Sequence, residues 1–196
     1  MDCADRQPAR KSQRDSIISF EVLAADALDG KVRGEIIRLC EAAYRESFTR
    51  LFDDLPASVH ILARDERGRL VSHAEWVTRW LQPDGHRVLR TAYVEAVATL
   101  PEHQRQGLAT AGLRRFANIV RNDATWDLAA LSPSDSAFYA RLGWELWEGP
   151  LAIRHDDGVE PTPADEEVMI LRLPRTPATL TKTSLLTAEW RVGELW

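Results

Sequence analysis

The hydrophobic pattern changes its period at Pro101, and this change limits the folds that the chain can adopt. Before Pro101 lie three runs rich in β-branched and aromatic residues, over residues 59–63, 70–81 and 88–99, with turn signals between them. Such runs are typical of a three-stranded meander. After Pro101 one helical face is apolar, and its members are Leu108, Ala111, Leu113, Phe116, Ile119 and Val120. The chain therefore joins an antiparallel sheet to an amphipathic helix.

Further elements are expected on both sides of this junction. The pattern predicts strands over residues 17–23, 126–131, 144–147 and 167–173, and helices over residues 34–47 and 134–142, the second stopped by Gly143. A strand–helix–strand crossover thus follows an antiparallel half. This order predicts an α+β fold around a mixed, mostly antiparallel sheet flanked by helices.

The length of 196 residues suits one domain with a full hydrophobic core. Residues 1–15 are polar and of mixed charge, so we expect a flexible N-terminal tail before a single domain over residues 16–196. Residues 174–196 are predicted to form an extended C-terminal tail, whose apolar residues distinguish it from a disordered segment.

The formal net charge is −5, which disfavours a nucleic-acid partner because phosphate binding needs a basic face. The first residues contain no apolar core of a secretory signal, and no apolar run is long enough to span a bilayer. We therefore expect a cytoplasmic protein without membrane contact. The two cysteines and five histidines form no spaced metal motif, so no metal is expected.

The strongest local motif runs from Gln104 to Ala109, between the third meander strand and the amphipathic helix. A loop at this place directs backbone N–H groups into open space, and the helix start adds its positive end. Gly107 leaves room for an approaching phosphate, while Gln104 and Arg105 add side-chain donors. The motif predicts a pyrophosphate site, although a helix start that merely tolerates small residues would look the same.

The order of elements and this loop resemble the GCN5-related N-acetyltransferase superfamily over roughly residues 17–148. The resemblance implies acetyl-CoA as cosubstrate, with its pyrophosphate on the loop. It also implies that the preceding strand bulges and splays from its neighbour, which opens a V-shaped slot for the cofactor. The cofactor-binding residues implied are Val97, Ala98, Gln104, Arg105, Gln106, Gly107, Leu108 and Ala109.

A narrower resemblance, to the aminoglycoside 2'-N-acetyltransferases, covers nearly the whole chain beyond the N-terminal tail. It is carried by residues 92–98, 130–132, 142–144 and 149–150 and, most specifically, by the ending Trp-Arg-Val-Gly-Glu-Leu-Trp. The resemblance implies transfer of an acetyl group to the 2'-amino group of an aminoglycoside, which confers antibiotic resistance. Kasugamycin and the larger 2-deoxystreptamine compounds are both open as substrates, and a homodimer is plausible by the same resemblance.

Two residues are candidates for the proton transfers that acetylation of an amine requires. Glu95 lies in the apolar run 93–97, where a carboxylate is costly unless it is paired, hydrated or functional. The resemblance implies that Glu95 acts as the base through water and that Tyr139 acts as the acid beside the coenzyme sulfur. The structural alternatives are an outward-facing or ion-paired Glu95 and a packing role for Tyr139.

A polyamine sugar also needs acidic anchors. The resemblance implies substrate contacts by Glu46, Ser132, Asp165, Glu194 and Trp196, the last through a terminal carboxylate. Each acid could instead be a solvated surface charge, and Ser132 a turn or capping hydroxyl. Glu46 and Glu194 stand where Asp is expected, so the reach is one methylene longer and the size of the substrate is open.

Two other functions fit the same sequence. An acetyltransferase for a polyamine, a peptide N-terminus or another small amine would share the loop and Glu95, but would not need the Trp-terminated tail. A CoA-binding module without turnover would use Glu95 and Tyr139 only for packing.

Overall fold

The computed structural model describes residues 17–55, 57–192 and 196. The N-terminal tail expected over residues 1–15 lies outside this range and stays a prediction. The helices are α1 (Gly30–Tyr44), α2 (Leu51–Asp54), α3 (Leu108–Asn122) and α4 (Ser136–Ala140), with 3-10 turns at Ala25–Ala27 and Pro101–His103. The strands are β1 (Ser19–Ala24), β2 (Val59–Arg64), β3 (Leu70–Pro83), β4 (Leu89–Val94), β5 (Ala98–Thr99), β6 (Leu128–Leu131), β7 (Glu145–Leu146), β8 (Leu151–His155), β9 (Gly158–Pro161), β10 (Met169–Arg172) and β11 (Leu186–Glu189).

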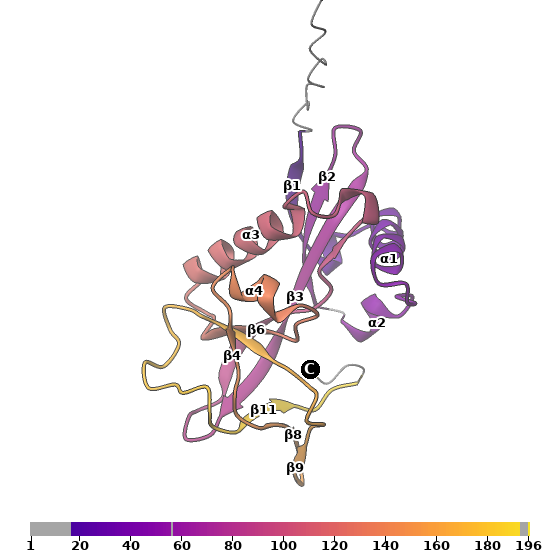
Figure 1. Ribbon diagram of the computed structural model, residues 1–196. Coiled ribbons are helices and arrows are strands. Elements are labelled where there is room, and N and C mark those ends of the chain that lie inside the picture. The colour runs from indigo at the N-terminus through magenta and orange to yellow at the C-terminus, as the bar shows by residue number, and fades with distance from the viewer. Residues whose placement is uncertain (1–16, 56, 193–195) are drawn as a thin grey trace, which may run out of the picture.

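The strands of the described chain form one curled, mixed sheet around β3 (Figure 1). Its main path runs β7-β10-β6-β4-β3-β11-β8-β9. Outside this path, β2 and β5 pair with β3, and β1 pairs with β2. The β4–β6 and β11–β8 pairs are parallel and the other pairs are antiparallel, which confirms the predicted α+β fold. The strand β3 contacts both halves of the sheet because it is 14 residues long.

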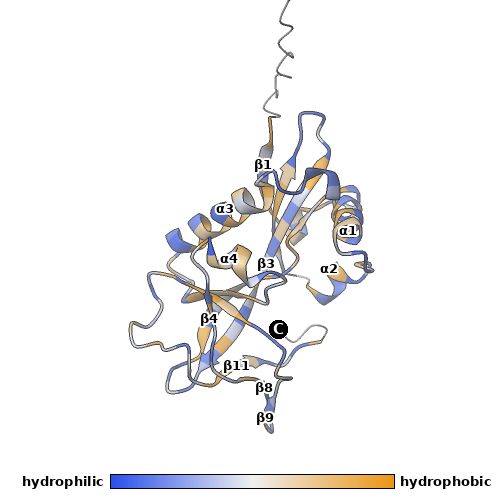
Figure 2. Cartoon of the chain, in the orientation of Figure 1, coloured by the Kyte–Doolittle hydropathy of each residue, from blue (hydrophilic) through white to orange (hydrophobic). Residues whose placement is uncertain are grey.

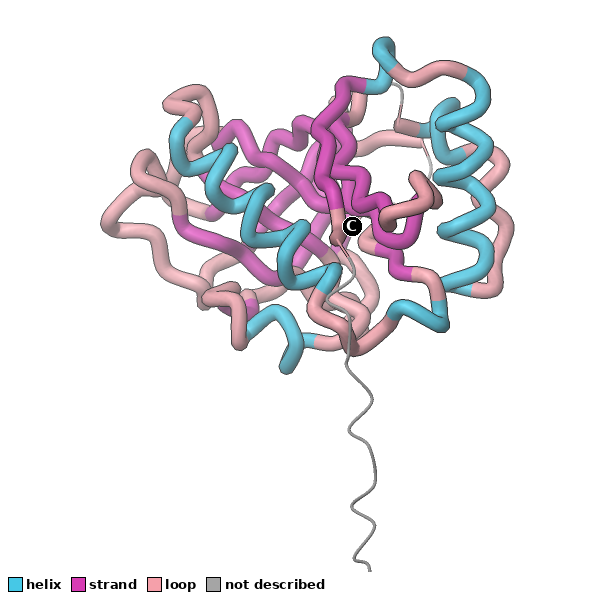
Figure 3. The backbone as a smooth tube through the Cα atoms, turned by 90° about the horizontal axis from the view of Figure 1, so that it is seen from above, coloured by secondary structure: helices cyan, strands magenta, loops and turns pink. Residues whose placement is uncertain are grey.

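Helices cover the two faces of this sheet (Figure 3). On one face α3 packs Leu113 and Phe116 against Trp76 of β3, as its apolar stripe predicts. On the other face α1 packs Ile36 and Leu39 against β2 and β3. Figure 2 shows α3 as a mixture of hydrophobic and hydrophilic residues, with a hydrophilic turn between β2 and β3. No helix in the described ranges is both long and apolar enough to cross a membrane.

The helix α1 begins four residues before the predicted start because Asp29 caps it. The Asp29 side chain accepts a hydrogen bond from the backbone N–H of Val32 at 2.8 Å. The helix ends where Arg45 adopts a left-handed conformation with φ of 63°. This ending turns the chain toward α2 and places the α1–α2 segment beside the end of β4.

The third meander strand, predicted as one run over residues 88–99, is divided into β4 and β5. The pairing of β4 with β3 ends at Val94 and Trp76, and the pairing of β5 begins at Ala98 and His73. Between these pairs one strand advances four residues and the other only three, so a β-bulge absorbs the extra residue. Among the described residues β5 pairs only with β3, so it separates from β6. This is the splay that the family resemblance implies.

The C-terminal segment is more ordered than the sequence suggests. Within the predicted extended tail, β11 pairs in parallel with β8 and in antiparallel fashion with the end of β3. The β8–β9 hairpin was not predicted because β9 is exposed along its whole length and has no apolar run, although Asp157-Gly158 is a residue pair that favours a hairpin turn. A third apolar core lies beneath this layer and holds Leu81, Ile153, Leu186 and Trp196.

Candidate active site

Two cavities meet at the break between β4 and β5. The first, here called the loop groove, has a volume of about 680 Å³ and lies between the residue 104–109 loop, α3 and α4. The second, here called the tail pocket, has a volume of about 430 Å³ and lies between the α1–α2 segment, the end of β4 and the segment after β11. Each cavity lies within the size range of small-molecule sites.

The loop groove is built largely from main chain. Arg105 and Gly107 have φ angles of 60° and 82°, and Gly107 is the N-cap of α3 without a capping side chain. The first backbone bond of α3 runs from the N–H of Ala111 to the carbonyl of Gly107. The N–H groups of residues 108–110 therefore have no acceptor within the helix, and the positive helix end faces the groove. This arrangement suits a phosphate group.

The charged side chains around the groove strengthen this preference for anions. Arg105, Arg114 and Arg141 are exposed and line it, and Asp135 also lines it. Six of the eight predicted cofactor residues lie along the groove: Val97, Gln104, Arg105, Gly107, Leu108 and Ala109. The other two do not: Ala98 is buried in β5, and the Gln106 amide donates to the carbonyl of Glu102.

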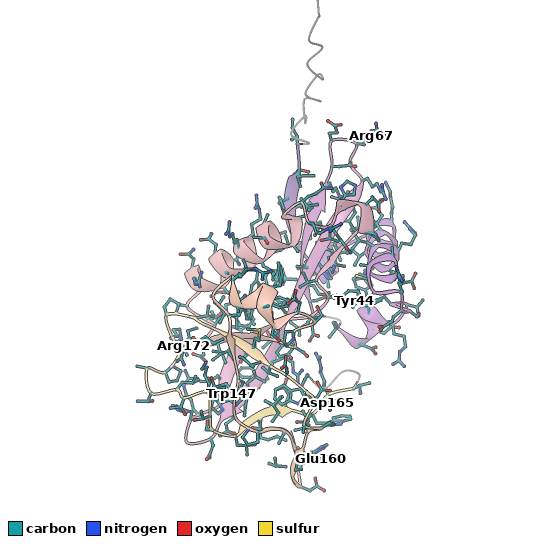
Figure 4. The ribbon with its side chains drawn as sticks, viewed as in Figure 1. Tyr44, Arg67, Trp147, Glu160, Asp165 and Arg172 are labelled. Atoms are coloured by element: carbon teal, nitrogen blue, oxygen red, sulfur yellow. The ribbon has the colours of Figure 1, made fainter. Side chains whose placement is uncertain are left out.

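The structure describes five of the residues predicted to act as the base or to bind the substrate, and four of them line the tail pocket: Glu46, Glu95, Ser132 and Trp196. Asp165, labelled in Figure 4, is exposed between β9 and β10. It lines neither cavity, so the structure does not bring it to the others. Glu194 lies outside the described residues.

Glu95 and Ser132 meet because two parallel strands end at the same edge of the sheet. Val94 of β4 and Leu131 of β6 are partners in the parallel ladder. The next residue on each strand, Glu95 or Ser132, therefore emerges at that edge, where the bulge opens the sheet. Both side chains line the tail pocket.

The carboxylate of Glu95 is paired with an arginine that the sequence did not indicate. Arg191 Nη1 donates to Glu95 Oε1 at 2.7 Å, and the two side chains are 15% and 12% exposed. Of the structural alternatives, the outward-facing Glu95 is therefore wrong, whereas the ion pair is present and lies inside the tail pocket. Arg191 belongs to the Trp-terminated ending, which was its only sequence signal.

Tyr139 projects from α4 into the loop groove and packs against Trp144 with its ring edge. Burial is the main cause that raises the pKa of its hydroxyl to about 12, and the nearby Asp135 adds to it. The hydroxyl therefore keeps its proton at neutral pH and can donate it. The packing role and the acid role are compatible, because Tyr139 is only 6% exposed and still lines the groove.

Tyr44 stands at the boundary between the two cavities and was missed from the sequence. It lines the tail pocket, whereas its bonding partner Val97 lines the loop groove. The Tyr44 hydroxyl donates to the carbonyl of Val97 at 2.8 Å and accepts from its N–H at 3.1 Å. Burial raises the pKa of this hydroxyl. No periodic pattern indicates such a contact, since the partners are 53 residues apart.

Trp196 is held in place at the floor of the tail pocket. Trp196 is 6% exposed and packs in the apolar core beneath β8 and β11. The indole Nε1 donates to Thr162 Oγ1 at 3.0 Å. Burial and this hydrogen bond fix the position of Trp196, whereas the sequence predicted only an extended tail.

A buried polar cluster lies beneath the pocket, on β2 and β3. His60 Nδ1 is 3.0 Å from His73 Nε2 and 3.2 Å from Glu75 Oε2. Burial lowers the pKa of His60 to about 4, and Arg33 contributes; burial also raises the pKa of Glu75 to about 8, with Glu95 as the next cause. Candidate ligand atoms of these three residues lie within 4.8 Å of one another, a grouping that sequence spacing did not indicate.

Comparisons with known proteins agree with this geometry. Residues 27–147 match the family described as acetyltransferase (GNAT) domain. Over 133 residues the chain is 38% identical to an aminoglycoside 2'-N-acetyltransferase of Mycolicibacterium fortuitum, with 66% of this chain and 67% of the relative covered.

Solved structures show the same fold at low identity. The GNAT family N-acetyltransferase YhbS of Escherichia coli, solved in complex with CoA, has 17% identity and a TM-score of 0.58, with 94% of this chain and 93% of that chain covered. ElaA of Escherichia coli has 13% identity and a TM-score of 0.57, with 80% of this chain and 99% of that chain covered.

Proposed function

The chain belongs to the GNAT family of acetyltransferases, and on that premise we propose that it transfers the acetyl group of acetyl-CoA to the 2'-amino group of an aminoglycoside antibiotic. Acetyl-CoA-dependent N-acetyl transfer is the activity of the family, and the proposal concerns the acceptor. The observation that carries it is the acidic tail pocket, which adjoins the groove at the β4–β5 break. The 38% identical relative supports the same acceptor class.

The loop groove fits the cosubstrate by its chemistry. Free amides at the start of α3 and three arginines suit the phosphates of a coenzyme A ester. A side-chain Cβ at position 107 would meet no protein atom within 4 Å, so glycine there leaves the approach to the amides open. When bound, acetyl-CoA supplies the acetyl group as a thioester, and Val97 lines the groove where the strand splays, with its own N–H and carbonyl engaged by Tyr44.

The chain's own residues would handle two protons. The acceptor amine must lose a proton before its nitrogen can form the new C–N bond, and Glu95 lies in the tail pocket to take that proton directly or through water. As the C–S bond breaks, the sulfur needs a proton, and Tyr139 in the loop groove carries one at neutral pH. Glu95 and Tyr139 thus line the two adjoining cavities, where they would serve the acceptor amine and the coenzyme sulfur respectively.

The tail pocket supports a cationic acceptor through Glu46, Asp54 and Glu95. Ser132 and Trp196 add a hydroxyl and an aromatic wall, which suit an aminosugar. Asp165 and Glu194 stay proposals as outer anchors. We also propose a cytoplasmic location, as expected for an enzyme that uses acetyl-CoA, and a homodimer, as the resemblance implies.

A thiol-release assay with acetyl-CoA tests the acceptor. We expect turnover with kasugamycin or with a 2-deoxystreptamine compound such as gentamicin or tobramycin, and none with a peptide or polyamine panel. Turnover of peptides alone would reject the aminoglycoside while leaving the acetyltransferase assignment intact.

Removal of Trp196 separates the same alternatives. The pocket loses a wall and the bond to Thr162, so we expect the KM for the antibiotic to rise about tenfold, a typical loss for one aromatic contact with its hydrogen bond. The affinity for acetyl-CoA should not change. An acceptor that does not use the tail would keep its KM.

A further inference from the structure

The Glu95–Arg191 pair places a fixed positive charge beside the proposed base. The two groups are joined at 2.7 Å and are largely withdrawn from water. At such exposure an ion pair and its field are weakened less by solvent and salt than on the open surface. Arg191 therefore influences any other cation that enters the tail pocket.

The backbone holds Arg191 in this position. The preceding residue, Trp190, donates its N–H to the carbonyl of Arg154 at 2.9 Å, which continues the β11–β8 pairing. Because the sheet fixes the segment, the guanidinium reaches Glu95 from an anchored strand end, 96 residues away along the chain.

Other charged and titratable groups surround the pair on every packed element. They are Tyr44 on α1, Glu46 after α1, Arg50 and Asp54 at α2, Glu75 and Arg79 on β3 and Tyr93 on β4. Glu166 before β10 acts on Tyr93, and Glu189 on β11 acts on Arg79. Arg191 is one of the causes that lower the pKa of Arg79, so the two guanidinium groups lie close enough to repel. Arg79 Nε donates to Glu189 Oε1 at 3.0 Å, so that carboxylate is already engaged by an arginine.

The acids of the tail pocket are partly neutralised before any substrate arrives. Asp54 accepts a hydrogen bond from Arg50 at 3.1 Å, and Glu95 accepts one from Arg191 at 2.7 Å. Two of the three carboxylates that line the pocket thus carry an arginine partner from the pocket itself. Such a pocket is acidic only in part, which matters for an acceptor with many amines.

We propose that Arg191 is a positioning and specificity-determining residue, whose guanidinium holds Glu95 and selects the unprotonated acceptor amine and acceptors that carry few positive charges. The inference rests on the proposed function, because it concerns how the same pocket distinguishes one aminoglycoside from another.

The selection follows from repulsion between like charges. A cation beside an amine disfavours its protonated form, and the unprotonated amine is the nucleophile that the reaction needs. The same cation opposes each additional ammonium group that a larger antibiotic brings into the pocket. Kasugamycin is smaller and less charged than the 2-deoxystreptamine compounds, so it is the acceptor class that Arg191 favours.

The test compares Arg191→Gln and Arg191→Lys across acceptors and pH. We expect the wild-type protein to prefer kasugamycin over tobramycin in kcat/KM. The Gln variant should lose about tenfold of that preference. Its pH profile of kcat for kasugamycin, which reports groups in the bound complex, should move about one pH unit higher, the effect expected when one charge interaction of this size is removed. The Lys variant keeps the charge and should restore both properties.

A matched control removes an arginine from an ion pair of similar exposure elsewhere. Arg64 Nη2 lies 2.8 Å from Glu35, and neither side chain lines the loop groove or the tail pocket. Arg64→Gln should change neither the acceptor ratio nor the pH profile. If Arg191→Gln lowers kcat/KM equally for both antibiotics without a shift in pH, Arg191 only supports the fold and the inference is wrong.

A second measurement needs no variant. Calorimetric titration of the wild-type protein with kasugamycin at pH 7, in buffers of different ionisation enthalpy, counts protons exchanged on binding. We expect proton release, because the amine binds in its unprotonated form. Binding without release would overturn the inference and leave the acceptor assignment standing, whereas no turnover of any aminoglycoside would overturn both.

Discussion

The loop groove and the tail pocket suit ligands of opposite charge and are built from different chemical groups. The groove presents backbone amides at the start of α3 and three exposed arginines, all drawn from a short stretch of chain and the adjoining helices. The pocket presents carboxylates, a serine and a tryptophan that come from four segments far apart in the sequence. The groove is suited to an anion and the pocket to a cation.

The difference shows where specificity can change. Backbone amides are supplied by any residue that adopts the loop conformation, so the groove tolerates many side chains while keeping its ligand. The pocket depends on individual side chains, and Glu95, Ser132 and Arg191 each rely on a separate strand end. A change of acceptor therefore requires few substitutions on the pocket side and none on the groove side.

The largest effect should come from Glu95→Gln, on the pocket side. We expect kcat to fall about 100-fold, a typical contribution of a positioned base, while the affinity for acetyl-CoA stays the same. The loss should be greatest at low pH, because more of the amine is protonated there. Steady-state kinetics from pH 6 to 9 measure it. Glu160→Gln is the control, because Glu160 is exposed on β9; equal loss at every pH would contradict the base role.

The next effect should come from Gly107→Val, on the groove side. Gly107 has a φ of 82°, and a β-branched side chain there would strain the loop and project toward the bound phosphates. We expect the Kd for CoA to rise about tenfold or more, since a misplaced loop loses more than one charge-assisted hydrogen bond, as measured by calorimetry.

Gly68→Val supplies the matched comparison for this loop variant. Gly68 has a φ of 75° in the β2–β3 turn, with equally open space around its Cβ, so the backbone strain is similar. An unchanged CoA affinity in Gly107→Val, or an equal loss in both variants, would show that the groove does not hold the cosubstrate through this loop.

The last effect, on stability and not on activity, should come from Glu75→Gln, beneath the pocket. The pKa of Glu75 is raised to about 8 in the folded chain, so the group adds stability that is complete below its unfolded value near 4.5 and is lost as the pH rises through 8. The variant lacks this titration and should gain up to about 1 kcal/mol per pH unit relative to the wild type between pH 5 and 8. Urea unfolding of both proteins at pH 5, 6.5 and 8 measures this difference in the free energy of unfolding. If the difference between variant and wild type is the same at all three pH values, Glu75 is not a buried carboxyl that carries a proton.

Much of the fold could be predicted from local patterns. The apolar stripe of α3 identifies this helix because it buries one regular face. The runs of β-branched and aromatic residues identify β2 and β3, which are buried along most of their length. The loop from Gln104 to Ala109 was found for the same reason, since its function depends on its neighbours in sequence. The division of β4 from β5 came only from the family resemblance, because a bulge leaves the residue types of a strand unchanged.

The parts that sequence reasoning missed depend on distant contacts. Tyr44 bonds to Val97 across 53 residues, and Arg191 bonds to Glu95 across 96. Neither pair produces a period or a spacing. The β8–β9 hairpin and β11 were missed because their short strands gain stability from pairing with β3 and with each other. Asp165 was placed by analogy of position, and the structure sets it apart from the pocket.

The continuity of β3 also restricts how such a protein can diverge. This strand pairs with β2 and β5 near its start, with β4 in its middle and with β11 at its end. Inserting a single residue within β3 would turn every later side chain of the strand to the opposite face of the sheet. The partners at its start and the partners at its end would then be out of register with each other. Among related proteins, insertions and deletions should therefore occur at the two turns that bound β3, near Arg67 and Gly85, and be rare within the strand.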